Sequence, residues 1–270
     1  MSFRLFCCLG LLSLSPLTAA PPPNVILILA DDLGYGDLAC YGHPLFQTPH
    51  LDQMAREGVR FTQFNCPSAF CAPTRSTLLT GRTPSRNGMR GNPAPDATPA
   101  ADAMVLPASE RLLPQVLGAA GYRADMLGKW HLGHQPGFLP TERGFESYFG
   151  IPYSNDMRPV RLLEGTQVAE EPAVQSTLTE RYTQRACDLI RRHQDEPFFL
   201  YLAHAMPHKP LAVSPAFDGR TGHGLYADVI AELDASIGTL RQTLADTGLT
   251  ERTLILFTSD NGPWFGGSTG

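Results

Sequence analysis

The chain is poor in charge, nearly devoid of lysine and short of long apolar runs. Of its 270 residues, 17% are charged, and the formal net charge of -5 gives no electrostatic reason to expect nucleic acid as a partner. Lysine occurs only at Lys129 and Lys209, so every other basic side chain except histidine is an arginine. No apolar stretch beyond residue 20 is long enough to span a bilayer, and we find no internal repeat or low-complexity tract. An anionic ligand would therefore have to be held by a local cluster of positive charge.

The first 20 residues have a composition of their own. Arg4 gives a basic start, Leu5–Leu17 is almost wholly apolar, and residues 18–20 are small. This pattern is typical of a secretory signal peptide and is too short for a comfortable membrane span. We therefore predict a signal peptide at 1–20, a single domain at 21–270, and export to the periplasm or the extracellular space, with no membrane association once the signal is removed.

Strand-like and helix-like segments alternate along the chain. Asn24–Ala30 is a continuous β-prone run, as in a strand buried on both faces. Thr177–His193 is the clearest amphipathic helix, with Tyr182, Ala186, Leu189 and Ile190 on one face. We predict strands at 24–30, 59–64, 122–127, 198–203 and 253–258, helices at 48–57 (with Thr48 as N-cap), 112–120, 177–193 and 225–244, and loops at 91–102 and 136–150. This order predicts βαβ units and an α/β fold with a mainly parallel sheet sandwiched by helices.

Polar clusters follow four of these predicted strands. They are Asp31-Asp32, Lys129 with His131, His208, and Asp260-Asn261. Because ligands of parallel sheets bind beyond the carboxyl ends of the strands, this shared placement predicts one convergent site. The oxygen donors of Asp31, Asp32, Asp260 and Asn261 suit a hard cation such as Ca²⁺ or Mg²⁺ rather than zinc. Taken singly, each pair could instead be an ordinary turn or helix cap.

Lys129 and His131 are two residues apart, so both side chains would point to one side of an extended segment. The plainer interpretation is a solvated lysine and a structural histidine beside Trp130.

The stretch Ser68–Arg82 carries the most specific pattern. It places Cys71, Pro73 and Arg75 in a C-x-P-x-R arrangement, followed by an apolar, helix-compatible run. A helix that begins just after Pro73 would direct its free N–H groups at the turn, where an anion could bind. Arg75 is suited to bind a tetrahedral oxyanion. An isolated motif of this kind would more often be a structural loop with a buried cysteine, but the surrounding polar clusters favour a site.

The motif and its neighbours resemble the sulfatase family, in particular arylsulfatases and N-acetylgalactosamine-6-sulfatase-like enzymes. The blocks N-V-I-L-I-L-A-D-D-L-G-Y-G-D-L, C-A-P-T-R-S-T-L-L-T-G-R, G-K-W-H-L-G, G-I-P-Y-S-N-D and S-D-N-G occur in the family's order over residues 24–262. The resemblance implies an alkaline-phosphatase-like fold and hydrolysis of aryl or carbohydrate sulfate monoesters. It also implies that formylglycine-generating machinery oxidises Cys71 to formylglycine, whose hydrate is the nucleophile.

The resemblance also implies a role for each site residue. Asp31, Asp32, Asp260 and Asn261 would bind Ca²⁺ or Mg²⁺ together with the modified Cys71. Arg75 and Lys129 would stabilise the formylglycine hydrate, and His131 would hydrogen-bond it. His208 would lie near the leaving group, although His204 is close enough in sequence to be mistaken for it. Ser154 matches a further substrate-binding position.

Two departures from the family pattern are present. Thr74 follows Pro73 where serine is more usual, which we expect to be tolerated. The family normally continues past Gly270 to a second active-site lysine, more sheet and a C-terminal subdomain. We therefore expect an incomplete catalytic domain whose 270-residue form has doubtful activity.

Two alternatives to an active sulfatase stay open. A phosphomonoester or phosphonate hydrolase of the same superfamily would use an unmodified Thr, Ser or Cys. A truncated remnant would bind anions without turnover.

The cysteines that follow the signal peptide leave disulfide pairing open. If Cys71 is converted, at most one pair can form among Cys40, Cys66 and Cys187. Small buried thiols are at least as plausible.

Overall fold

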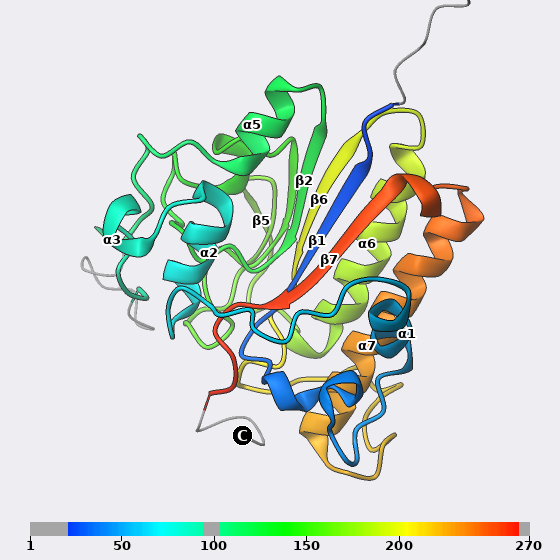
Figure 1. The fold of residues 1–270 in the computed structure, drawn as a ribbon. Coiled ribbons are helices and arrows are strands. Elements are labelled where there is room, and N and C mark those ends of the chain that lie inside the picture. The colour runs from blue at the N-terminus through cyan, green and yellow to red at the C-terminus, as the bar shows by residue number, and fades with distance from the viewer. Residues whose placement is uncertain (1–20, 94–102, 265–270) are drawn as a thin grey trace, which may run out of the picture.

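A computed structural model describes residues 21–93 and 103–264 of the protein (Figure 1). The predicted signal peptide at 1–20 and most of the predicted loop at 91–102 lie outside the described residues. Seven strands form one sheet in the order β5-β4-β3-β2-β6-β1-β7. Their bounds are β1 Asn24–Ala30, β2 Arg123–Gly128, β3 Ser147–Gly150, β4 Leu162–Glu164, β5 Gln167–Glu170, β6 Phe198–Ala203 and β7 Thr253–Ser259. In the part of the sheet that runs β3-β2-β6-β1-β7, every pair of neighbouring strands is parallel. The pairs β3–β4 and β4–β5 are antiparallel. The prediction of a mainly parallel α/β sheet is therefore confirmed.

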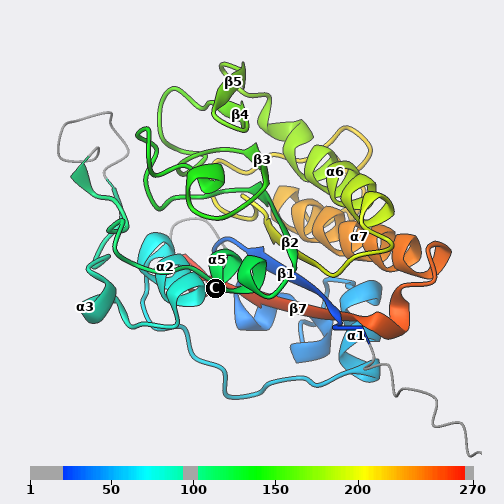
Figure 2. The ribbon, with the colours of Figure 1, turned by 90° about the horizontal axis from the view of Figure 1, so that it is seen from above.

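Helices cover both faces of the sheet (Figure 2). Their bounds are α1 Pro49–Glu57, α2 Cys71–Thr80, α3 Pro84–Asn87, α5 Leu113–Ala119, α6 Leu178–Arg192 and α7 Leu225–Asp246. One apolar layer joins α6, α7 and α1 to the sheet, and a second layer joins α2 and α5 to the opposite face. No helix of the described residues is both long enough and apolar enough to cross a membrane.

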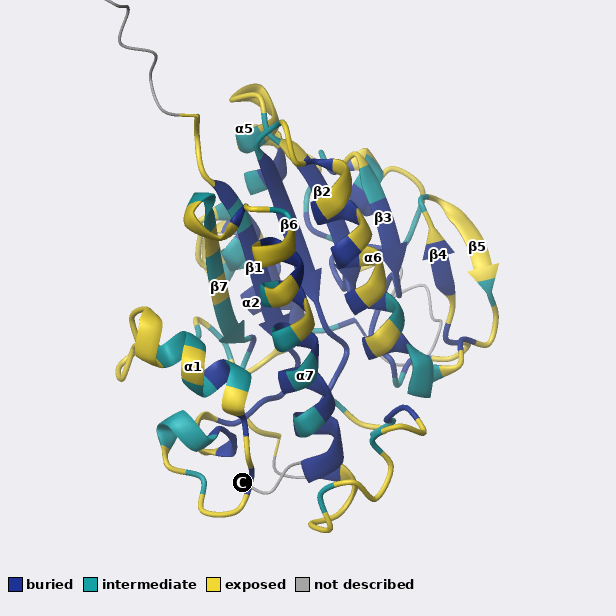
Figure 3. Ribbon diagram, turned by 90° about the vertical axis from the view of Figure 1, so that its right-hand side faces the viewer, coloured by how far each residue is buried: buried dark blue, intermediate teal, exposed yellow. Residues whose placement is uncertain are grey.

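The central strands are buried on both faces, and this explains why their sequences are unbroken apolar runs. Along β1, Ile26 and Ile28 face the layer of α6 and α7, whereas Leu27 and Leu29 face the layer of α2 and α5. Each of these four side chains is buried, and every residue of β6 is buried as well. Figure 3 shows the ribbon of β6 in the colour of buried residues. Because both faces are covered, hydrophobic side chains are required at successive positions.

Several local predictions are wrong. Residues 59–64 form no strand and expose Val59, Phe61 and Phe64, since no neighbouring strand pairs with them. The predicted loop at 136–150 ends in the strand β3. The hairpin of β4 and β5 was not predicted, because strands of three and four residues carry too little periodicity.

One helix start differs from prediction, and another is where it was predicted but is capped in a different way. Helix α2 begins at Cys71 and not after Pro73, so that proline lies inside its first turn, where a missing N–H is tolerated. Thr48 occupies the N-cap position of α1, but its hydroxyl makes no capping hydrogen bond. Instead the Asp234 carboxylate of α7 accepts hydrogen bonds from the backbone N–H groups of His50 and Leu51. A contact between distant segments thus replaces the local cap.

All four cysteines among the described residues are free thiols. These are Cys40, Cys66, Cys71 and Cys187.

Candidate active site

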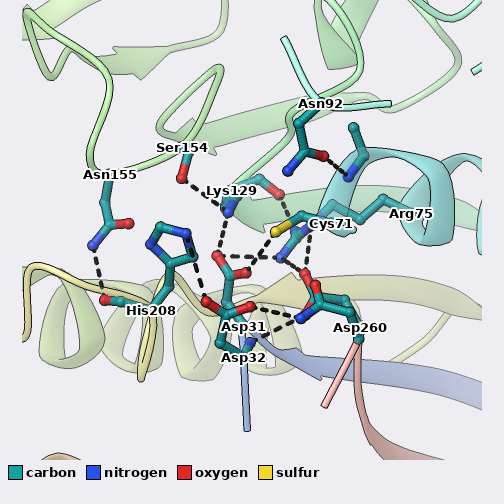
Figure 4. A network of polar contacts seen from close by, with 12 residues as sticks. Asp31, Asp32, Cys71, Arg75, Asn92, Lys129, Ser154, Asn155, His208 and Asp260 are labelled. Atoms are coloured by element: carbon teal, nitrogen blue, oxygen red, sulfur yellow. Dashed lines mark hydrogen bonds and ion pairs between the residues drawn. The ribbon is translucent and has the colours of Figure 1, made fainter. Parts of the chain in front are cut away.

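Polar side chains converge beyond the carboxyl ends of the central strands (Figure 4). Asp31 and Asp32 follow β1, Lys129 follows β2, His208 lies in the loop after β6, and Asp260 and Asn261 follow β7. Helix α2 adds Cys71 and Arg75 from its first two turns. The ten predicted site residues lie around this point: Asp31, Asp32, Cys71, Arg75, Lys129, His131, Ser154, His208, Asp260 and Asn261.

An oxygen-rich cluster forms the floor of this site. One donor atom from each of Asp31, Asp32, Cys71 and Asp260 lies within 4.8 Å of the others. The side-chain amide of Asn261 donates to Asp32 Oδ1 over 2.7 Å, while its own Oδ1 is buried and has no hydrogen-bond partner among the described residues. Buried polar atoms are rarely left unpaired. An unpaired amide oxygen beside three carboxylates fits the ligand preference of Ca²⁺ or Mg²⁺.

Helix α2 brings the cysteine and the arginine to the same face of the cluster. Cys71 and Arg75 are four residues apart, which on a helix puts them one above the other. Cys71 Sγ lies 3.3 Å from Asp31 Oδ1. The buried Arg75 guanidinium donates to Asp260 Oδ2 over 3.0 Å and to the Lys129 carbonyl over 2.7 Å. Arg75 therefore links β2 and β7 across the site.

Lys129 is a buried cation and not a solvated one. Its Nζ lies 2.5 Å from Asp31 Oδ2 and 3.1 Å from Ser154 Oγ. The preceding residue, Gly128, has φ 101°, and a Cβ atom there would lie 1.8 Å from the Ala203 carbonyl oxygen. Only glycine permits this close approach, which turns the chain at the end of β2 and directs Lys129 into the site.

His131 lies close enough to Lys129 to feel its charge, and its own backbone has a positive φ of 62°. Its ring is buried, and neither ring nitrogen has a hydrogen-bond partner among the described residues. Burial, reinforced by the charges of Lys129 and Arg75, holds the pKa of His131 well below its usual value. A neutral imidazole with unused hydrogen-bonding capacity therefore lies beside two cations, which is unlike a satisfied structural histidine.

The structure separates His208 from His204. His208 Nε2 lies 3.6 Å from Asp32 Oδ2, and its Nδ1 donates to the Lys209 carbonyl over 2.6 Å. His204 is fully buried next to Ser236 of α7, where burial lowers its pKa to about 4. His208 is thus the histidine of this loop that reaches the cluster.

The sulfatase family profile matches residues 23–270. The chain belongs to the sulfatase family. It is 43% identical to human arylsulfatase A over 92% of the chain, and 41% identical to human N-acetylgalactosamine-6-sulfatase over 93%. It spans about half the length of these curated relatives, 53% in each case.

Solved structures agree with this membership. A structure from work on the metabolism of multiple glycosaminoglycans by Bacteroides thetaiotaomicron aligns with a TM-score of 0.82 and 30% identity, over 90% of this chain and 63% of that one. Ps i-CgsB, solved in complex with k-i-k-neocarrahexaose, aligns with a TM-score of 0.79 and 27% identity, over 92% and 60% of the two chains. The phosphonate monoester hydrolase of Agrobacterium radiobacter aligns with a TM-score of 0.63 and 19% identity, over 90% of this chain and 64% of that one, and so shares the fold alone.

The electrostatics of this sulfatase-family site are unbalanced towards negative charge. Burial would raise the pKa of Asp31, but the charges of Lys129, His208 and Arg75 outweigh it and hold the pKa low. Burial and the Asp31 charge raise the pKa of Asp260 to about 7. Burial and the Asp31 charge also raise the pKa of Asp32. A divalent cation would relieve this mutual repulsion.

Backbone strain coincides with the same cluster. Asp32 (φ 64°) and His131 (φ 62°) are the non-glycine residues with positive φ in the described part of the chain. Such conformations cost of order 1–3 kcal/mol and persist where the surroundings fix them. Both strained residues belong to the site, and such strained backbone conformations typically cluster at functional sites.

Sequence reasoning missed two asparagines that shape the site. The buried Asn155 donates from Nδ2 to the carbonyls of His208 (3.2 Å) and Pro210 (3.4 Å), which fixes the loop that carries the histidine. Asn92 Oδ1 accepts from the backbone N–H of Ala72 in the first turn of α2 (2.9 Å). Asn155 directly follows Ser154 in the block G-I-P-Y-S-N-D, so this block could have indicated it as a site residue. Nothing in the sequence around Asn92 indicated a role for that residue.

Proposed function

We propose that this chain is the catalytic part of a sulfuric ester hydrolase that cleaves aryl or carbohydrate sulfate monoesters. The observation that carries the proposal is the position of Cys71, in the first turn of α2 and 3.3 Å from Asp31, with Arg75 one turn further on. The names of the relatives, arylsulfatase A and N-acetylgalactosamine-6-sulfatase, support a sulfate ester as substrate.

The proposed nucleophile is a formylglycine made from Cys71, present as its hydrate. One hydrate oxygen attacks the sulfur, the S–O bond to the alcohol breaks, and the alcohol leaves with a proton. The second hydroxyl then loses its proton, the aldehyde C=O re-forms, and sulfate is expelled. A proton donor for the alcohol and a proton acceptor for the hydrate are therefore needed on opposite sides of the sulfur.

The surrounding side chains supply these functions in our proposal. Arg75 and Lys129 offset the growing negative charge, and removing one such contact commonly costs about 3 kcal/mol of transition-state stabilisation. His131 hydrogen-bonds the hydrate. His208 faces the leaving alcohol, and Ser154 binds a sulfate oxygen beside Lys129.

Asp31, Asp32, Asp260 and Asn261 would hold a Ca²⁺ or Mg²⁺ ion together with the modified residue 71. When bound, this ion supplies charge stabilisation to the sulfate group. The unpaired Asn261 oxygen and the repulsion among the three carboxylates support this assignment.

Domain limits and location are also proposals. We infer a signal peptide at residues 1–20, a catalytic domain at 21–270, export to the periplasm or the extracellular space, and formylglycine-generating machinery as a partner.

Conversion of Cys71 is tested by peptide mass measurement. Made in a host with the maturation machinery, the protein should yield a peptide in which the CH₂–SH of Cys71 has become CHO. Cys71→Ser should abolish both the mass change and turnover of an aryl sulfate, whereas the matched control Cys40→Ser should keep both. A peptide that holds only unmodified Cys71, from protein that still turns over the ester, would show that the nucleophile is assigned wrongly.

A phosphonate or phosphomonoester hydrolase is the second candidate, because one such enzyme shares the fold. It predicts faster turnover of a phosphonate monoester than of the matching sulfate ester, with Cys71 unmodified. We expect the reverse order.

The cation is tested by thermal unfolding with and without Ca²⁺. A ligand at 100 times its Kd adds about 2.7 kcal/mol to the free energy of unfolding, which moves the melting temperature upward. Asn261→Ala should reduce the shift, while Asp188→Asn on the exposed face of α6 should leave it unchanged. An equal shift in all three proteins would place the cation elsewhere.

A further inference from the structure

A lysine and a tryptophan meet beside the proposed leaving-group histidine. The ammonium group of Lys209 lies 3.4 Å from the centroid of the Trp264 indole ring. Lys209 directly follows His208, and Trp264 follows Asn261 by three residues. The pair therefore joins the two loops that leave β6 and β7.

Contacts to the site fix both loops. Asn155 donates to the carbonyls on either side of Lys209, those of His208 and Pro210. On the other loop, Asn261 donates to Asp32, and the next turn lies so close to the chain after β1 that a Cβ on Gly34 would be 3.2 Å from Pro263 Cβ. The lysine and the indole are thus held at a defined place next to the cluster.

The positive charge of this lysine stays available to a ligand. No carboxylate within residues 21–93 or 103–264 forms an ion pair with Lys209, in contrast to the exposed Arg185, which pairs with Glu164. An aromatic face attracts and orients an ammonium group but does not neutralise it as a carboxylate would. The Trp264 side chain is also 40% exposed, so part of the indole remains open to an apolar or sugar ring.

We propose that Lys209 and Trp264 form a subsite for a second anionic group on the substrate. This inference rests on the proposed sulfate ester hydrolysis and names its substrate class: a glycan sulfate that carries a further carboxylate or sulfate on the alcohol side. The sugar ring lies against the indole, and the second anion binds the Lys209 ammonium. Because His208 faces the leaving alcohol, a group on that alcohol is the part of the substrate that reaches this pair.

The test compares two esters in the natural full-length protein. One is a monoanionic aryl sulfate, and the other is a sulfated disaccharide with a second charge, prepared once with a uronate carboxylate and once with a second sulfate. Lys209→Met removes the charge but keeps the length of the side chain, and Lys209→Arg restores the charge. The matched control is Arg185→Met, which removes an exposed arginine of α6 whose Cζ lies 4.4 Å from the ring centroid of Phe149 in β3.

We expect Lys209→Met to lower the ratio of kcat/KM for the dianionic ester to that for the aryl sulfate about tenfold, the size of one lost charge-assisted hydrogen bond. The change should lie mainly in KM, because the contact is made in ground state and transition state alike. Lys209→Arg should recover most of the ratio, and Arg185→Met should leave it as in the natural protein. A loss with only one of the two disaccharides would identify carboxylate or sulfate as the recognised group.

A ratio that stays within twofold in Lys209→Met, or a fall of the same size in Arg185→Met, would overturn the subsite. Either result is distinct from failure of the proposed function, in which the natural protein would hydrolyse neither ester.

Binding without turnover gives a second readout. The chain holds two tryptophans, of which Trp130 is fully buried and Trp264 is 40% exposed. In the Cys71→Ala protein, the dianionic disaccharide should change the indole emission and protect it from acrylamide quenching. Trp264→Phe should diminish that response. An undiminished response in Trp264→Phe would contradict the subsite.

Discussion

Replacing Gly128 by alanine should be among the most destabilising single changes in this protein. The new methyl group would lie 1.8 Å from the Ala203 carbonyl oxygen and 2.6 Å from its carbon, both of them backbone atoms that cannot rotate away. At φ 101° the residue would also be strained by its own side chain. That strain costs roughly 1–2 kcal/mol. Separation of β2 from β6 at this point would break the hydrogen bond from Lys129 N–H to the Ala203 carbonyl (2.8 Å) and leave buried polar groups unpaired, a further cost of about 1–3 kcal/mol.

Together these effects predict a loss of about 2–5 kcal/mol in the free energy of unfolding for Gly128→Ala. Gly121 is the matched control, because it has φ 89° but open space around its missing Cβ. Gly121→Ala should therefore show the backbone strain alone, about 1–2 kcal/mol. The measurement is urea unfolding followed by circular dichroism, with linear extrapolation to water. Equal losses in the two variants would refute the steric reasoning, whereas failure of Gly128→Ala alone to fold would agree with it.

Two further predictions concern buried charge. Arg75→Met should lower the free energy of unfolding by about 3–5 kcal/mol in the presence of chelator, because the buried Asp260 carboxylate loses its ion-pair partner and Asp31 keeps only Lys129. Arg185→Met should change it by less than about 0.5 kcal/mol. Comparable losses would contradict the role of burial. His193 Nε2 lies 3.0 Å from the buried Asp125 carboxylate, and this contact raises the pKa of His193 above its ordinary 6.5. The contribution of protonated His193 to the free energy of unfolding should therefore be complete below pH 6.5 and disappear as the pH rises through the raised pKa. His193→Gln should flatten the pH dependence of the free energy of urea unfolding between pH 5.5 and 8.5. An unchanged profile would show that the protonation of this pair is not linked to folding.

The sequence predicted the central sheet well because each central strand is buried on both faces. The runs at 24–30 and 198–203 match β1 and β6 residue for residue, and the helix predicted at 177–193 matches α6 to within one residue at each end. These elements carry enough apolar residues in a clear period to be recognised without tertiary information. Short elements such as β3, β4 and β5 depend on neighbours for their hydrogen bonds, so their sequences alone do not indicate them.

The site was predictable to the extent that it lies at strand ends. Asp31, Asp32 and Asp260 were placed together by the rule that parallel strands end at one edge. The turn at His131 was not predictable, because a non-glycine residue at φ 62° is held by its surroundings and not by its own preference. Asn155 was missed for a related reason: its side chain donates hydrogen bonds to backbone carbonyls more than fifty residues away, and the sequence alone does not show that contact.

The order of strands in the sheet has a consequence for synthesis on the ribosome. Strand β1 is made early, yet both of its neighbours, β6 and β7, are made late; the hydrogen bond between Asn24 and Phe198 spans 174 residues, and that between Asp32 and Asn261 spans 229. At translation rates of about 5–20 residues per second, β1 waits on the order of ten to thirty seconds for its first partner. During that interval an apolar strand with unpaired backbone groups is available to chaperones and to other nascent chains. The Cys71 segment remains accessible for the same period, because the strand ends that bury it do not yet exist.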